Sequence, residues 1–154
     1  MKKVIRFLIT FGALALGVFA QQLSADKVPA SVRQSYQSKF EGVRKVEWKL
    51  KSDRNYEAEF RLHGVDIAAK FDPIGNWLET ETTIPRSKLT RQVRAAISKE
   101  FKGYVIVETQ KIERFDEKRI LFEVHLANAK EILKTQFEVD GTLLSKSAKA
   151  KKGA

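Results

Sequence analysis

Glu123 and His125 are the two side chains whose type and spacing come closest to an acid–base pair. They lie two residues apart in a stretch that alternates apolar and polar residues, so they would share one face of a strand. A histidine beside a carboxylate can move a proton near neutral pH, which would suit a hydrolase. The pair is also an ordinary polar contact on a solvated strand face, and we favour that interpretation because no nucleophile accompanies it. The other histidine, His63, lies in an expected turn, and two distant histidines do not make a zinc pattern.

Acidic and basic residues alternate along several expected strands. Paired carboxylates could hydrolyse a glycosidic bond. Opposite charges on neighbouring strands more commonly solvate one face of a sheet, and this is the interpretation we favour. The acidic residues are Glu57, Glu59, Asp66, Glu79, Glu81 and Glu123, and the basic residues are Lys49, Lys51, Arg61, Lys70 and Lys134. Since the chain has no cysteine and no glycine-rich phosphate loop, we expect no catalytic residues, no metal and no cofactor.

Two similar units would position these residues. Each unit begins with an expected helix, over residues 28–40 and 89–101, in which apolar residues recur every four positions. Strand-like runs with alternating polarity follow each helix. A hairpin pattern at residues 71–78, with Asp and Pro before the turn and Gly within it, returns at residues 137–144. The repetition indicates one unit written twice.

The periodicity predicts an α+β fold made by tandem duplication of a helix followed by three or four antiparallel strands. Two helices would pack on one face of an approximately eight-stranded antiparallel sheet, because strands that are apolar on one face need cover there only. The first repeat would span residues 28–83, a connector residues 84–88 and the second repeat residues 89–144. Two separate lobes are the alternative, which we disfavour because a lobe of roughly 60 residues without disulfides is only marginally stable.

The other face of this sheet is expected to be open, polar and free to bind a partner. Its expected contact residues are Trp77, Glu57, Glu59, Arg61, Lys70 and His125. Trp77 has two interpretations. On the polar face it would anchor a partner, whereas a tryptophan at a hairpin end or in the core is the commoner outcome for a large aromatic residue.

Both ends of the chain are basic. Lys2, Lys3 and Arg6 precede an apolar run ending near Ala20, which predicts a signal peptide over residues 1–20. The run is shorter than the roughly 20 residues of a membrane span, so we expect cleavage near Ala20, no stable span afterwards, and a periplasmic or secreted product. Residues 21–27 would be a loose leader. Residues 145–154, with four lysines, would be a disordered tail in weak contact with acidic envelope material.

The formal net charge of +10 is concentrated at these two ends, so the domain between them is only mildly basic. A mildly basic domain with mixed charges does not favour a nucleic-acid partner.

Three segments carry a resemblance to a known family: Val28-Pro29 at the expected helix start, "YEAEF" at residues 56–60 and "FDPIGNWLE" at residues 71–79. With the doubled pattern, which covers residues 28–144, they resemble the PepSY-like family of exported proteins, which is likened to the beta-lactamase inhibitor protein. The resemblance implies helices against an antiparallel sheet, and binding or inhibition of exported enzymes, without catalytic residues. The second unit departs from the pattern at Thr90 and Leu143, which stand in place of Pro29 and Trp77, so a symmetric function is not implied.

We therefore expect an exported, non-enzymatic binding module that binds or inhibits another exported protein or peptide through the open sheet face. A binder of a small ligand or a cell-envelope polymer, using the tail and the sheet, is the second hypothesis. A hydrolase that uses Glu123 and His125 is the third and the least favoured.

Overall fold

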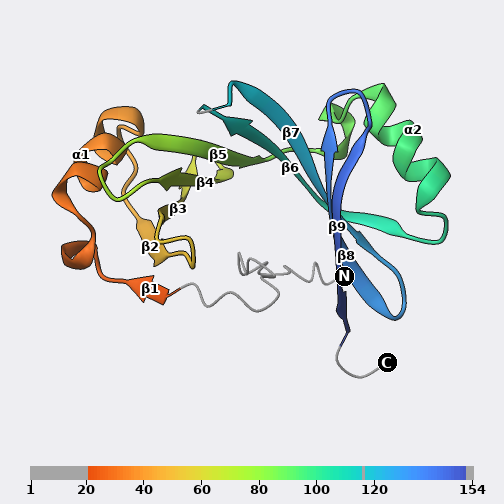
Figure 1. Ribbon diagram of the computed structural model, residues 1–154, viewed down its shortest axis with the longest axis horizontal. Coiled ribbons are helices and arrows are strands. Elements are labelled where there is room, and N and C mark those ends of the chain that lie inside the picture. The colour runs from red at the N-terminus through yellow and green to blue at the C-terminus, as the bar shows by residue number, and fades with distance from the viewer. Residues whose placement is uncertain (1–20, 116, 152–154) are drawn as a thin grey trace, which may run out of the picture.

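A computed structural model describes residues 21–115 and 117–151, and the signal peptide expected over residues 1–20 lies outside this described part. In the described residues, nine strands form one antiparallel sheet in chain order, β1 to β9, accompanied by two α-helices (Figure 1). The first half contains β1 (Gln21–Leu23), η1 (Ala25–Lys27), α1 (Ala30–Lys39), β2 (Val46–Leu50), β3 (Tyr56–Leu62), β4 (Val65–Phe71) and β5 (Trp77–Thr83). The second half contains η2 (Arg86–Lys88), α2 (Arg91–Glu100), β6 (Val105–Arg114), β7 (Arg119–Ala127), β8 (Glu131–Glu138) and β9 (Leu143–Ala150).

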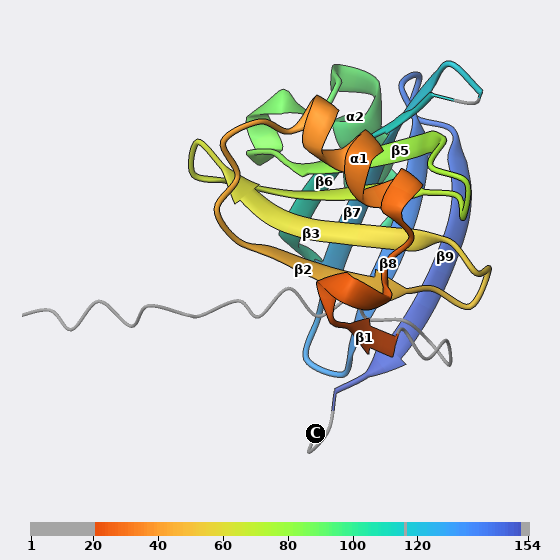
Figure 2. The ribbon, with the colours of Figure 1, turned by 90° about the vertical axis from the view of Figure 1, so that its left-hand side faces the viewer.

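Both helices lie on the same face of the sheet. The strand register sets Ile67, Thr82, Lys111, Phe122 and Phe137 directly opposite one another across β4 to β8. Side chains opposite one another in a ladder share a face. Ile67 packs against the core beneath α1, and Phe122 and Phe137 belong to the core beneath α2. Figure 2 shows the two helices on one side of the strands. We name the two surfaces the helix-covered face and the helix-free face.

The sheet twists strongly across its width: in Figure 1, β5 runs across the view, whereas β8 and β9 run from top to bottom. Two separate apolar cores form on the helix-covered face. Under α1, Val32 and Tyr36 pack with Trp48, Phe60 and Phe71. The rings of Tyr36 and Trp48 meet edge to face with their centroids 5.2 Å apart. These aromatic contacts fix the position of α1, whose polar residues face solvent.

Under α2, the recurring apolar residues of the sequence again face the sheet. Val93, Ile97 and Phe101 pack on Leu126 and Phe137, among other strand residues. Thr90 caps the helix, because its hydroxyl oxygen accepts a hydrogen bond from the Val93 backbone N–H at 3.1 Å. Pro29 occupies the corresponding cap position of α1, where no side chain makes such a bond.

One glycine in each half lets a hairpin touch a helix. Gly75 and Gly141 have φ values of +95° and +90°. A β-carbon at Gly75 would lie 2.8 Å from the carbonyl oxygen of Ser31 in α1, and one at Gly141 would lie 2.7 Å from that of Gln92 in α2. Both the backbone conformation and the close approach therefore require glycine. The repeated hairpin pattern thus marks two equivalent contacts between a hairpin and a helix.

Both ends of the described chain correct the sequence analysis. The leader over residues 21–27 is not loose, since Gln21–Leu23 pairs with β2 as a ninth strand, beyond the approximately eight expected. Residues 145–150 are not a disordered tail, since Leu143–Ala150 pairs with β8 along its whole length. Composition suggested disorder because it does not report the unpaired N–H and C=O groups that an edge strand offers to a neighbour. Lysines on an edge strand also discourage pairing with a second molecule.

Candidate interaction face

The helix-free face carries most of the charged residues that the sequence singled out. Across β1 to β7 one row of directly opposed residues alternates in charge over five positions. This row is Gln22, Lys49, Glu57, Lys70, Glu79, Arg114 and Arg119. The next row contains smaller and apolar residues at its centre: Glu47, Glu59, Ala68, Glu81, Ile112, Leu121 and Glu138. Ladder geometry therefore brings together residues that lie far apart in the sequence.

The carboxylates on the first half of this face are buried and paired with lysines. Glu57 and Glu59 are 5% and 8% exposed. The ammonium of Lys51 lies 3.0 Å from the Glu57 carboxylate, and that of Lys49 lies 2.6 Å from the Glu59 carboxylate. Removing one partner of such a sheltered pair leaves the other charge without compensation, so these pairs stabilise a particular arrangement of the strands.

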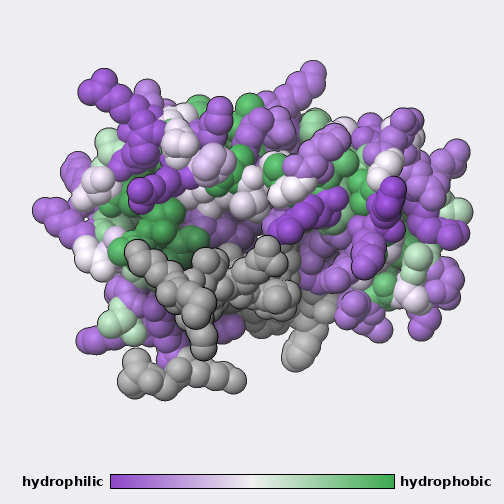
Figure 3. Space-filling view, turned by 180° about the vertical axis from the view of Figure 1, so that it is seen from behind, coloured by the Kyte–Doolittle hydropathy of each residue, from purple (hydrophilic) through white to green (hydrophobic). Residues whose placement is uncertain are grey.

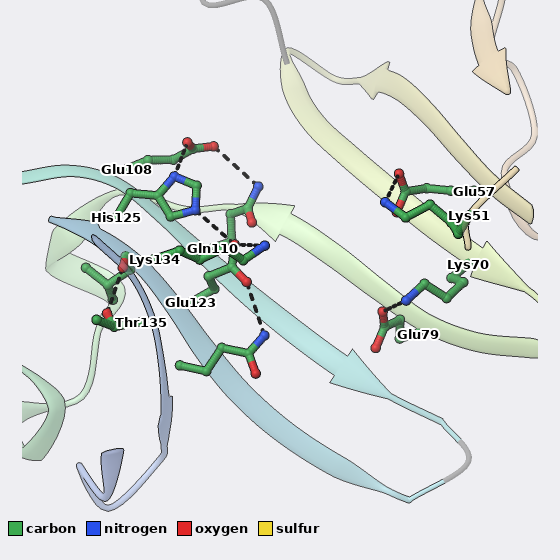
Figure 4. Close-up of polar contacts among 12 residues, drawn as sticks. Lys51, Glu57, Lys70, Glu79, Glu108, Gln110, Glu123, His125, Lys134 and Thr135 are labelled. Atoms are coloured by element: carbon green, nitrogen blue, oxygen red, sulfur yellow. Dashed lines mark hydrogen bonds and ion pairs between the residues drawn. The ribbon is translucent and has the colours of Figure 1, made fainter. Parts of the chain in front are cut away.

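Glu79 continues this network toward the second half. Its carboxylate lies 2.6 Å from the Lys70 ammonium (Figure 4). It also lies 3.2 Å from Nε of Arg114. Burial opposes the charge on Lys70, but the neighbouring carboxylate of Glu79 outweighs it, and the pKa of Lys70 is raised. Lys70 is therefore fully charged at neutral pH.

His125 lies between two carboxylates in the second half. Its Nδ1 is 2.9 Å from Glu108 and its Nε2 is 3.0 Å from Glu123 (Figure 4). Glu123 is only 1% exposed and also receives the Lys134 ammonium at 2.8 Å and an N–H of Gln136 at 3.1 Å. His125, Lys134 and Gln136 thus surround the Glu123 carboxylate with three donors.

This network holds both members of the suspected acid–base pair in their charged forms. Burial opposes the charge of Glu123, but the hydrogen bond from His125 and the charge of Lys134 lower its pKa to about 2. Burial likewise opposes the charge of His125, but hydrogen bonds to Glu108 and Glu123 raise its pKa to about 9. A general acid or base works best with a pKa near the operating pH. The geometry therefore favours a structural ion network over proton transfer.

Glu81 differs from its neighbours on this face. It is partly buried, and the residues directly opposite it are Ala68 and Ile112, which are 4% and 1% exposed. Within the described residues no hydrogen bond or ion pair reaches its carboxylate. Burial, with the charge of Glu123 nearby, raises the pKa of Glu81 to about 7, although Lys134 opposes this shift. Glu81 is thus a partly buried carboxyl flanked by two apolar residues of the ladder, and the described residues supply it with no hydrogen bond or ion pair.

A cavity of about 290 Å³ lies at the end of the face where β5 runs into η2. Thr83, on the same strand and face as Glu81, contributes to its wall, together with Ile84 and the β6 residues Ile106 and Val107. The remaining lining residues are Asp66, Arg86, Glu108 and Thr109. Val107 is 52% exposed at a register shift in β6, so the cavity opens to solvent beside an irregular stretch of strand.

Five of the six expected contact residues lie on the helix-free face, and Trp77 does not. Glu57, Glu59, Lys70 and His125 belong to the networks described above. Arg61 lies at the rim, 66% exposed, and makes two hydrogen bonds of 2.7 Å to the Asp66 carboxylate.

The structure corrects the expectation that Trp77 lies on the open face. The reason is a register shift between Lys70 and Phe71. The shift sets Trp77 opposite Phe71, on the helix-covered face, although Glu79 stays opposite Lys70. Its ring lies 5.6 Å from that of Phe40 and 3.8 Å from that of Phe115. Trp77 therefore extends the core under α1, the outcome that is commoner for a large aromatic residue.

Sequence reasoning did not identify Gln110, Ile112 or Arg114 as residues of the helix-free face. The register shift in β6 between Ile106 and Glu108 breaks the simple alternation from which their facing could have been inferred. Leu121 also lies on the helix-free face, buried beside Ile112.

Comparison with known proteins identifies the class to which this fold belongs. Residues 54–145 match the family described as "Putative beta-lactamase-inhibitor-like, PepSY-like", and the chain belongs to this family. A search of curated proteins finds no match.

Solved structures share the fold at low sequence identity. A DUF2874 family protein from Bacteroides uniformis has a TM-score of 0.70 at 18% identity, covering 78% of this chain and 88% of its own. A protein described as "putative periplasmic" from Bacteroides eggerthii has a TM-score of 0.71 at 18% identity, over 79% and 88% of the two chains. A BLIP-like protein from Bacteroides fragilis has a TM-score of 0.63 at 20% identity, over 78% and 85%. At such identities the likeness concerns the fold alone.

Proposed function

We propose that this protein is an exported, non-enzymatic binding module whose helix-free face binds another exported protein or peptide. The observation that carries the proposal is the composition of this face. It combines charged side chains in fixed positions with the carboxyl of Glu81, which has no ion pair among the described residues, above the buried apolar side chains of Ile112 and Leu121. Fixed charges that can complement a partner are a feature of protein interfaces. The beta-lactamase-inhibitor-like description of the family also supports a binding role.

The proposal includes an origin of the two halves by duplication. The matching contacts of Gly75 with α1 and Gly141 with α2, and the helix and hairpins in each half, support it. The expected partner surface is nevertheless not symmetric, since the Glu123–His125 network in the second half has no counterpart of the same residues in the first.

Export is supported by the basic and apolar pattern at the N-terminus and by the description of the Bacteroides eggerthii structure as periplasmic. In the described part of the chain, no helix has the length and apolar character needed to cross a membrane.

A partner-capture experiment with variants of both faces tests the proposed function. Arg61→Glu reverses a charge at the rim of the helix-free face, and Glu81→Gln removes the central charge. Lys99→Glu, on the exposed side of α2, is the matched control for charge reversal. Each variant is incubated with the periplasmic fraction, and bound partner is crosslinked and recovered. We expect the two face variants to recover less partner than the unaltered protein and the control to recover as much. Equal partner recovery from all three variants would reject this face as the binding surface.

The cavity beside Thr83 favours binding of a small ligand as the second candidate function, because about 290 Å³ approaches the size of known small-molecule pockets. Native mass spectrometry of the protein purified from its host would show an added mass in this case. Filling the cavity with Val107→Trp should abolish that added mass. The earlier idea that a free basic tail binds envelope polymer is weakened, because residues 143–150 form β9.

A further inference from the structure

Glu81 and Glu47 are the carboxylates of the helix-free face that make no ion pair within the described residues, and their settings are opposite. Glu47 is exposed near the edge of the sheet, where water can solvate its charge. Glu81 lies on β5, the central strand of the nine, between the buried side chains of Ala68 and Ile112. Neither of these neighbours can donate a side-chain hydrogen bond to it. A sheltered carboxylate without a donor is costly, so a cation delivered by a partner would be favoured there.

Glu81 does not line the cavity, but the cavity begins at Thr83, two residues further along β5. Glu81 and Thr83 are alternate residues of β5 on the same face, which places them roughly 7 Å apart along the strand. The wall formed by Ile84, Ile106 and Val107 is apolar and suits an aliphatic side chain. Alternate side chains of an extended peptide have the same spacing of roughly 7 Å.

Building on the proposed function, we propose that the helix-free face receives an extended segment of a partner protein that sets a lysine or arginine against Glu81 and an aliphatic side chain in the cavity beside Thr83. The two side chains would be two residues apart in the segment. Charge complementarity selects this occupant, because the other described carboxylates near the centre of the face already hold cations of this chain.

The test uses the purified full chain and short synthetic peptides followed by NMR titration. The lead probe is acetyl-Leu-Thr-Lys-amide. A second peptide replaces Lys with Gln and a third replaces Leu with Ser. Glu81→Gln removes the proposed anchor, and Glu47→Gln removes an unpaired carboxylate of the same face as the matched control. Val107→Trp fills the cavity, and Val105→Trp places the same ring on an exposed residue of β6 that does not line it.

We expect the lysine peptide to shift the amide signals of Ala68, Glu81 and Ile112 and to bind about tenfold more tightly than the glutamine peptide. This ratio should fall to about one in Glu81→Gln and persist in Glu47→Gln. Val107→Trp should reduce the affinity for the lysine peptide to that for the peptide with Ser in place of Leu, whereas Val105→Trp should not. A charge preference that survives in Glu81→Gln overturns the proposal, and so does an absence of binding by the lysine peptide up to about 10 mM.

The pH dependence provides a second readout. Charged groups that act on Glu81 or face it come from every strand around it: Glu57, Glu59, Lys70, Glu79, Glu108, Arg114, Glu123, His125 and Lys134. Affinity for the lysine peptide should rise severalfold between pH 6 and pH 8 as Glu81 loses its proton, because the pKa of Glu81 is about 7. Glu81→Gln should abolish this rise. A rise that persists in Glu81→Gln would assign it to another group and overturn the role of Glu81.

The proposed function and this inference can fail separately. If Arg61→Glu abolishes partner capture but Glu81→Gln changes neither capture nor peptide binding, the face binds a partner without a cation at Glu81. If neither variant affects capture although the lysine peptide binds at Glu81, the cation site exists but does not serve the partner.

Discussion

Replacing Glu123 with glutamine should destabilise the protein by about 3 kcal/mol at neutral pH. Glu123 is 1% exposed, and its carboxylate contacts the charged groups of His125 and Lys134. Its pKa of about 2 against an ordinary value of 4.5 corresponds to about 3 kcal/mol of stabilisation. Glutamine keeps the size of the side chain but leaves the two cations without their shared counter-charge.

The effect of Glu123 on stability should depend on pH in a definite direction. A carboxyl whose pKa is lowered on folding contributes its full stabilisation above the unfolded value of 4.5, and the contribution disappears as the pH falls toward 2. The stability of the unaltered protein should therefore fall between about pH 5 and pH 2 more steeply than that of Glu123→Gln. The raised pKa of His125 acts in a separate window, where its contribution is present below 6.5 and is lost as the pH rises through about 9.

Urea unfolding followed by tryptophan fluorescence measures these free energies at each pH. The matched control is Glu47→Gln, an exposed carboxylate of the same face, which should change the free energy of unfolding by no more than about 0.5 kcal/mol. A Glu123→Gln protein within about 0.5 kcal/mol of the unaltered protein at pH 7, with an unchanged acid slope, would refute the assignment of Glu123 as the central charge of this network.

Three further predictions concern other parts of the molecule. Glu81→Gln should stabilise the protein by about 1–3 kcal/mol at pH 8 and have little effect at pH 4, because a carboxyl whose pKa is raised on folding lowers the stability of the folded state once it is charged. Unfolding curves at both pH values check this prediction, and destabilisation at pH 8 would contradict it. Gly75→Ala and Gly141→Ala should each lower the free energy of unfolding by about 2–4 kcal/mol, since the new β-carbon meets a helix carbonyl. Gly64→Ala, at a residue with φ +80° and open space around it, should lower it by about 1 kcal/mol. Thermal or urea unfolding measures these changes, and equal changes at all three glycines would argue against the contact. A chain ending at Leu144 should lose most of β9 and self-associate through the uncovered edge of β8, which sedimentation would detect as concentration-dependent mass; a stable monomer would show that β9 is dispensable.

The sequence predicted the helices within a few residues and placed most of the charged face correctly. Glu57, Glu59, Lys70 and His125 could be assigned to one face because their strands alternate without interruption. Trp77 could not be placed, because a single extra residue in β5 reverses the facing of everything before it. No composition or periodicity reports such a shift, since it belongs to the pairing of β4 with β5.

The sequence alone determined the matching apolar periodicity of the two halves, their matching hairpin and the polar residues that alternate with the apolar ones. It could do so because side-chain direction in a regular strand or helix follows from local geometry. Which charges meet was decided by the tertiary structure. Lys134 forms an ion pair with Glu123, whereas no cation in the described part of the chain forms one with Glu81, although both carboxylates look alike in the sequence. The physical reason is that ion pairing on a sheet depends on the register between strands, which only the assembled ladder fixes.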